Sequence, residues 1–168
     1  QSASALMITL NDLLDYSSIQ AGEVQLDIRP VALDDLLSDV IDLFGTAISR
    51  KKVTLNCFIE SRVPRVVETD PMRLKQILIN LLSNSIKHTD QGEISINISM
   101  RDQHPDGHIS LLAEVGDSGE GIDPDNLTAI RSGQFREKQG GMGLEVTSEL
   151  SKLLGGDLSI NSNPGQGT

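Results

Sequence analysis

The sequence is poor in aromatic residues, in basic residues and in cysteine. Aromatic side chains make up 2% of its 168 residues and there is no Trp, so the stacking surfaces of single-stranded nucleic-acid binders are missing. Lys and Arg number 14 against 24 Asp and Glu, for a net charge of −10, which excludes a general attraction to nucleic acid or anionic lipid. Cys57, the one cysteine, lies in an alternating apolar stretch and is expected to pack as a small hydrophobe in a reducing compartment.

Long apolar runs are also missing. No stretch approaches the roughly 18 apolar residues that a membrane helix needs, and no charged-then-apolar leader opens the chain. We therefore expect a soluble segment. Hydrophobic residues make up 38% of the chain, which is enough to bury the core of one domain with a short appendage.

Apolar spacing predicts the elements of the first half. Residues 3–19 carry apolar side chains at helical spacing, which indicates a helix that needs a partner. Gly22 suits a helix end, so we place a boundary there, followed by a short alternating strand at 24–28. A one-sided helix is expected over 33–48 and a half-buried strand over 53–59.

The second half begins with a strong helix start. Asp70 can accept amide protons at the cap and Pro71 has no amide proton to leave unpaired, which predicts a helix to about His88. An antiparallel hairpin of strands 94–100 and 109–115 follows. Residues 116–143 are expected to form a long loop with a short helical turn at 125–131, and a helix at 144–154 precedes a final hairpin that starts at 158–160.

Three motifs carry candidate chemistry, and the first lies on the helix expected after Pro71. Asn80 and Asn84 are four residues apart, and Lys87 follows three residues later on the same side. An Asn oxygen suits magnesium, a hard cation that bridges to phosphate oxygens, and a lysine suits phosphate charge. Taken alone, the strip is better explained as a helix flank that faces solvent.

The second motif, Asp117-Ser-Gly119-Glu-Gly121-Ile122, follows a predicted strand. Its glycines permit close backbone approach to a ligand, and a carboxylate at a strand end can accept hydrogen bonds from an exocyclic amine. An ordinary Asp-Gly turn would have the same sequence.

The third motif places Gly141 and Gly143 before Leu144 at a helix start, where unpaired amides and the helix dipole favour phosphate. A Rossmann-type fingerprint is excluded, because no strand of a parallel βαβ unit precedes it.

The order of these motifs resembles the N, G1 and G2 boxes of the histidine kinase branch of the GHKL ATPases, which also include gyrase, Hsp90 and MutL relatives. Residues 13–22 resemble the end of the second dimerisation helix of hybrid sensor kinases, and residues 70–80 are similar to the approach to their N box. The resemblance implies an α+β fold, a two-layer α/β sandwich of the GHKL (Bergerat) type. Its mixed sheet is covered on one face by about three helices and is preceded by a helix.

The same resemblance implies a domain division and a site. Residues 1–22 correspond to the C-terminal part of the dimerisation and phosphoacceptor helical hairpin, and 23–168 to an ATP-binding catalytic domain that extends further. ATP and Mg²⁺ are the implied ligands, with Asn84 on the metal, Asn80 and Lys87 near the phosphates and Asp117 on the adenine amine. The implied nucleotide-binding residues are Asn80, Asn84, Lys87, His88, Asp117, Gly119, Gly121, Ile122, Gly141, Gly143, Leu144 and Thr168.

The chain also departs from the family pattern. The phosphoacceptor histidine lies upstream in the family, and we interpret His88 as a pocket-rim residue and His104 and His108 as solvated. The stretch between Ile122 and Gly140 is short for a lid, although three of its basic residues could clamp phosphate: Arg131, Arg136 and Lys138. Glu145 stands where the family has glycine, and a carboxylate near a triphosphate lowers affinity.

Three functions follow as hypotheses. The first is the catalytic domain of a sensor histidine kinase, which donates the γ-phosphoryl of Mg-ATP to a histidine on the dimerisation domain. The alternative is a degenerate kinase domain that regulates another sensor kinase by direct contact. A gyrase- or chaperone-type relative is weakened by the helix at 3–19 and by residues 70–87. For the kinase we expect the cytoplasmic portion of a membrane-anchored protein, dimeric at full length, with a response regulator or receiver domain as partner and no nucleic acid.

Overall fold

The computed structural model describes residues 24–132 and 141–168. The helix expected over 3–19 and the boundary at residue 22 lie outside the described residues. Among the described helices, none has both the length and the apolar content needed to cross a membrane.

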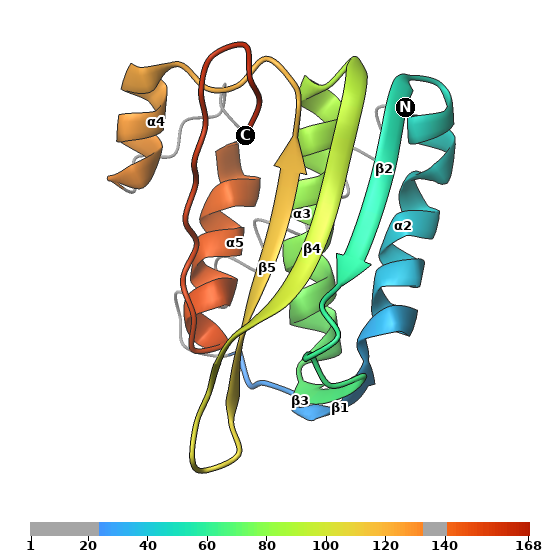
Figure 1. Ribbon diagram of the computed structural model, residues 1–168. Coiled ribbons are helices and arrows are strands. Elements are labelled where there is room, and N and C mark those ends of the chain that lie inside the picture. The colour runs from blue at the N-terminus through green and yellow to red at the C-terminus, as the bar shows by residue number, and fades with distance from the viewer. Residues whose placement is uncertain (1–23, 133–140) are drawn as a thin grey trace.

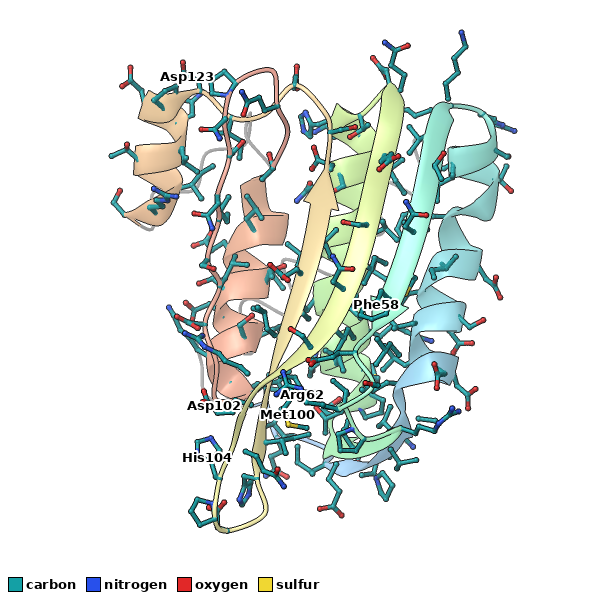
Figure 2. All side chains as sticks on the ribbon, viewed as in Figure 1. Phe58, Arg62, Met100, Asp102, His104 and Asp123 are labelled. Carbon is teal, nitrogen blue, oxygen red and sulfur yellow. The ribbon has the colours of Figure 1, made fainter. Side chains whose placement is uncertain are left out.

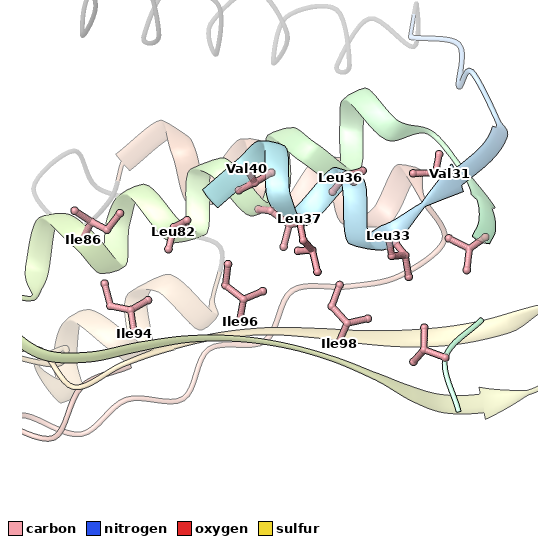
Figure 3. Packing of buried hydrophobic residues seen from close by; sticks show 13 residues of the cluster. Val31, Leu33, Leu36, Leu37, Val40, Leu82, Ile86, Ile94, Ile96 and Ile98 are labelled. Atoms are coloured by element: carbon pink, nitrogen blue, oxygen red, sulfur yellow. The ribbon is translucent and has the colours of Figure 1, made fainter. Parts of the chain in front are cut away.

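The described chain forms two layers, a sheet and a set of helices that cover one of its faces (Figures 1 and 3). Strand β4 (Gln91–Gln103) lies in the centre of the sheet, parallel to β2 (Lys52–Ile59) and antiparallel to β5 (Ile109–Asp117). The helices of the other layer are α2 (Leu33–Ser49), α3 (Pro71–His88) and α5 (Gly141–Leu153). This arrangement confirms the predicted two-layer α+β fold with a mixed sheet.

The main hydrophobic core lies between the helices and β4. Alternate residues of β4 point toward the helices, as period-two spacing predicts, and α2 and α3 meet them with their apolar sides (Figure 3). The buried side chains of these three elements are Leu33, Leu36, Leu37, Val40, Leu78, Leu82, Ile86, Ile94, Ile96 and Ile98. A smaller cluster of Ile77, Val146 and Leu150 joins α3 to α5.

Helix α3 begins as predicted, with Asp70 as its N-cap. One carboxylate oxygen accepts from the Arg73 amide at 3.0 Å, and the other accepts from the Asp27 amide at 2.9 Å. The buried Asp70 side chain therefore caps the helix and also holds the segment that enters β1 (Arg29–Ala32).

Replacement of Asp70 by Ala is expected to lower the free energy of unfolding by about 2 kcal/mol, because it removes a cap and a second backbone hydrogen bond. Asp70→Asn keeps one acceptor and caps a helix well, so its loss should be smaller. Urea unfolding followed by circular dichroism measures both variants. No loss in Asp70→Asn would show that the second carboxylate oxygen contributes nothing, and equal losses in the two variants would contradict the contribution of the cap.

Two predictions of strands were wrong. Residues 24–28 are not a strand; instead β1 pairs antiparallel with β3 (Val66–Thr69), which the sequence analysis did not identify. Residues 158–160 form no ladder either, and the C-terminal segment has one isolated bridge, between Asn163 and Gly167. Both misses have one cause: a short strand exists only where a partner backbone lies beside it, and that partner is distant in sequence.

Cys57 is exposed, which contradicts its expected packing. It lies on β2, an edge strand of the three-stranded sheet. The short helix α4 (Pro124–Arg131) confirms the helical turn expected in the loop. Its N-cap Asp123, labelled in Figure 2, accepts from the amides of Asp125 and Asn126 at 3.0 and 3.4 Å.

Candidate functional site

A large open cavity adjoins the end of β5 and continues along that strand. Its volume is about 1230 Å³, and its walls come from α3, β5, the loop after β5, α5 and the C-terminal segment. Of the residues predicted for the site, the cavity is lined by Asn84, His88, Asp117, Gly121, Ile122, Leu144 and Thr168. Residues from all three motifs therefore meet at one cavity, although they are far apart in sequence.

Asp117 is the last residue of β5, and both of its carboxylate oxygens are held. Oδ1 accepts from the Gly119 amide at 3.0 Å, and Oδ2 accepts from the Ser85 hydroxyl at 3.1 Å. Ser85 lies on α3, is only 5% exposed and also lines the cavity. The sequence analysis missed Ser85, because a serine beside two polar helix residues carries no signal of burial.

The glycines of the second motif allow protein backbones to approach one another. A Cβ on Gly119 would lie 2.3 Å from the His88 carbonyl oxygen. Gly121 has φ +69°, and a Cβ there would lie 2.1 Å from the carbonyl oxygen of Asn163. Both glycines let the loop lie close against the end of α3 and the C-terminal turn, and Gly121 also lines the cavity.

Thr168 lies directly beside Asp117. The two residues exchange both backbone hydrogen bonds, at 2.8 Å from the Asp117 amide and 3.2 Å from the Thr168 amide. The Ser162 hydroxyl lies 2.9 Å from Thr168 Oγ1, donates to the Gly167 carbonyl oxygen at 2.7 Å and accepts from the Ile122 amide at 2.8 Å. Ser162, which the sequence analysis also missed, thus joins the loop after β5 to the C-terminal turn.

The polar strip predicted on α3 divides into three environments. Asn84 is half-buried, lines the cavity and makes no side-chain hydrogen bond with another described residue. Asn80 is buried, and its amide donates to the Gly143 carbonyl oxygen at 3.4 Å, at the contact between α3 and α5. Lys87 is exposed and lies outside the cavity lining. Asn84 is therefore the one residue of the strip whose side chain lines the cavity without a protein partner.

At the rim of the cavity, His88 pairs with Glu120. The distance between His88 Nδ1 and Glu120 Oε1 is 2.7 Å, and the Glu120 amide donates to the His88 carbonyl oxygen at 3.3 Å. This agrees with the interpretation of His88 as a rim residue. Figure 2 shows His104 beside the β4–β5 hairpin turn, at the other end of the sheet, where the residue is exposed.

The third motif opens helix α5 as expected. Gly141 is the first residue of the helix, and the Gly143 carbonyl oxygen accepts from the Thr147 hydroxyl at 2.8 Å as well as from Asn80. Leu144 is buried and lines the cavity, whereas Glu145 is half-buried and outside the lining. Glu145 is therefore next to Leu144 on the helix but does not itself line the cavity.

Arg131, expected as one of three basic residues that could clamp phosphate, bonds to the C-terminal segment. Its guanidinium donates to the Ile160 carbonyl oxygen at 3.0 and 2.8 Å and to Asn161 Oδ1 at 2.9 Å. These bonds engage Nε and Nη2 of the guanidinium and tie the end of α4 to the C-terminal segment. Arg136 and Lys138 lie outside the described residues.

A metal ion at this cavity would have few protein ligands. Within residues 24–132 and 141–168, no group of three or more His, Cys, Asp or Glu side chains could hold a metal ion. The unpaired Asn84 oxygen fits a magnesium ion that takes most of its ligands from phosphate and water. The residues present thus suit a metal that arrives with a phosphorylated ligand.

Comparisons with known proteins agree on one family. Residues 69–168 match the family model described as histidine kinase-, DNA gyrase B-, and HSP90-like ATPase. Hybrid signal transduction histidine kinase B of Dictyostelium discoideum is 36% identical over 99% of the chain, and sensor histidine kinase RcsC of Escherichia coli is 34% identical over 99%. The chain spans 9% and 18% of the lengths of these two relatives.

Among solved structures, full-length ShkA in complex with AMPPNP has a TM-score of 0.79 at 28% identity, over 99% of this chain and 35% of that one. The catalytic domain of histidine kinase ThkA, in a nucleotide-free form, has a TM-score of 0.60 at 25% identity, over 76% of this chain and 80% of that one. The likeness to ShkA therefore extends over almost the whole chain.

Proposed function

Because the chain belongs to the histidine kinase-, DNA gyrase B-, and HSP90-like ATPase family, in its sensor histidine kinase branch, we propose that residues 23–168 bind Mg-ATP. In this proposal the bound nucleotide donates its γ-phosphoryl to a histidine on a dimerisation helix. The observation that carries the proposal is that one cavity is lined both by an anchored Asp117 carboxylate and by an Asn84 carboxamide that has no side-chain partner among the described residues.

Asp117 recognises the base of the nucleotide in this proposal. Its carboxylate is held by donors on both oxygens and keeps lone pairs for further hydrogen bonds. Such an acceptor suits the N–H groups of an exocyclic amine and repels a carbonyl oxygen. Thr168, paired with Asp117 through the backbone, lies at the same end of the cavity, and its hydroxyl adds a second polar group there.

Asn84 supplies the other end of the site. A neutral carboxamide oxygen is a hard ligand, and Mg²⁺ completes its coordination with phosphate oxygens and water. When bound, the metal neutralises charge on the phosphates, and the residues of this chain then position the nucleotide. We propose that Lys87 and Asn80 act from near the phosphates, and that Gly141 and Gly143 shape this end of the site.

The partners follow from the same proposal. Relatives named as hybrid and sensor histidine kinases support a phosphoacceptor helix and a receiver domain or response regulator as partners, in a dimeric full-length protein. We propose residues 1–22 as the end of that helical hairpin, and the whole chain as the cytoplasmic portion of a membrane-anchored sensor kinase.

Calorimetric titration with a non-hydrolysable ATP analogue, with and without magnesium, tests the nucleotide site. We expect micromolar to sub-millimolar binding, about −5 to −8 kcal/mol, that weakens when magnesium is withheld. In Asn84→Ala the affinity in magnesium should fall about tenfold or more, toward the metal-free value, because the metal loses its protein ligand.

Ser83→Ala is the matched control for this experiment, since Ser83 is exposed on the same helix and outside the cavity lining. Its affinity should equal that of the original chain. Full magnesium dependence in Asn84→Ala would contradict the metal assignment, and no binding by the folded original chain would contradict the proposed function.

A further inference from the structure

We propose that Ser85 is a positioning residue that orients the Asp117 carboxylate toward the ligand and thereby sets selectivity for an amine-bearing base. The inference rests on the proposed function, in which Asp117 reads the base. It adds Ser85, which lies within the first motif on α3 but was not among the predicted site residues, to the recognition of the ligand at the end of β5.

The direction of the Ser85 hydroxyl carries the inference. Serine and threonine inside helices commonly donate back to the carbonyl four residues earlier. Thr147 and Ser151 of α5 do so, at 2.8 Å each. The Ser85 hydroxyl instead donates across to Asp117 Oδ2 at 3.1 Å, to a residue 32 positions later in the chain.

Burial makes this contact specific. Ser85 is 5% exposed, so water has little access to its hydroxyl and the Asp117 oxygen is its side-chain partner among the described residues. A hydrogen bond to a charged group is stronger than one between neutral groups, and more so where solvent is excluded. The contact therefore joins Ser85, on the part of α3 that lines the cavity, to the Asp117 carboxylate, which recognises the base in the proposed function.

Two donors are needed because the aspartate carboxylate does not orient itself. Its terminal torsion is broad and roughly two-fold, so the rotamer alone leaves the plane of the carboxylate free. The Gly119 amide holds Oδ1 and the Ser85 hydroxyl holds Oδ2. With both in place, the remaining lone pairs keep one direction, and a ligand amine meets an acceptor that is already aligned.

A structural role for Ser85 and a positioning role make different predictions. Loss of packing near α3 would weaken every nucleotide that fills the cavity. Loss of carboxylate alignment would weaken only nucleotides whose base offers an N–H to Asp117. A purine nucleotide without the 6-amino group separates the two roles, since it has no exocyclic amine.

The test is titration of the chain and of Ser85→Ala, in magnesium, with the non-hydrolysable ATP analogue and with the same analogue lacking the 6-amino group. We expect Ser85→Ala to lose about tenfold in affinity for the first and less than about twofold for the second, which is the size expected for one charge-assisted hydrogen bond. Ser83→Ala, exposed on the same helix, should leave both affinities unchanged.

Equal losses for the two nucleotides, or no loss for either, would overturn the inference while leaving the proposed function standing. If the original chain binds neither nucleotide, the proposed function fails and the inference fails with it. Should Ser85→Ala unfold, Ser85→Cys keeps a side chain of similar size with a weak donor, and it must show the same selective loss.

Discussion

Asp117→Ala is expected to weaken binding of the Mg-ATP analogue about tenfold to a hundredfold and to leave the fold intact. The carboxylate lies at the end of β5, lines the cavity and is held by Gly119 and Ser85. Its removal deletes the charged acceptor for the base, and a hydrogen bond to a charged group contributes about 1.5–3 kcal/mol. A loss of this size corresponds to about a ten- to hundredfold increase in Kd.

The fold should survive because Asp117 pairs with Thr168 through its backbone, and these hydrogen bonds do not need the side chain. Calorimetry measures the affinity and circular dichroism checks the fold. Asp42→Ala removes the same charge from an exposed position on α2 and should bind normally. Unchanged affinity in Asp117→Ala would remove this carboxylate from the site.

Leu82→Ala is expected to lower the free energy of unfolding by about 3–4 kcal/mol. Leu82 is 0% exposed and belongs to the main core between α3 and the sheet (Figure 3). Truncation of a buried leucine loses both its transfer free energy and the packing around the cavity that remains. Because domains of this size are stable by only about 5–15 kcal/mol, the variant should unfold at clearly lower urea.

Urea denaturation at equilibrium gives this difference directly. Leu43→Ala is the control, since Leu43 lies on α2 with 64% of its surface exposed, and its change should stay within about 0.5 kcal/mol. A similar loss in the two variants would contradict the placement of the core.

The helices and the hairpin were predictable because their signals are local. Asp70 and Pro71 mark the start of α3 whatever surrounds them, and the structure confirms the cap. Alternating apolar residues predicted β4 for the same reason. The β1–β3 ribbon was not predictable in this way, because each of its strands has four residues and depends on the other for its hydrogen bonds.

The candidate site also combines residues that local sequence could identify with contacts that depend on distant parts of the chain. Local sequence could point to Asp117 and Asn84, because a carboxylate after a buried strand and a carboxamide on a helix carry recognisable chemistry. It could not distinguish Asn80 from Asn84, since helical spacing puts both on one side. Packing of α5 decides between them: it buries Asn80 against Gly143 and leaves Asn84 in the cavity.

The sequence by itself determined the main helices, the β4–β5 hairpin, the family and the residue types available for chemistry, because helix caps, apolar periodicity and motif order are properties of neighbouring residues. Only the tertiary structure decided which polar groups are partnered. The Ser85–Asp117 hydrogen bond and the Thr168 backbone pair join residues that are far apart in the chain. Such contacts depend on how the helix layer sits on the sheet, and that is set by the packing of the whole core.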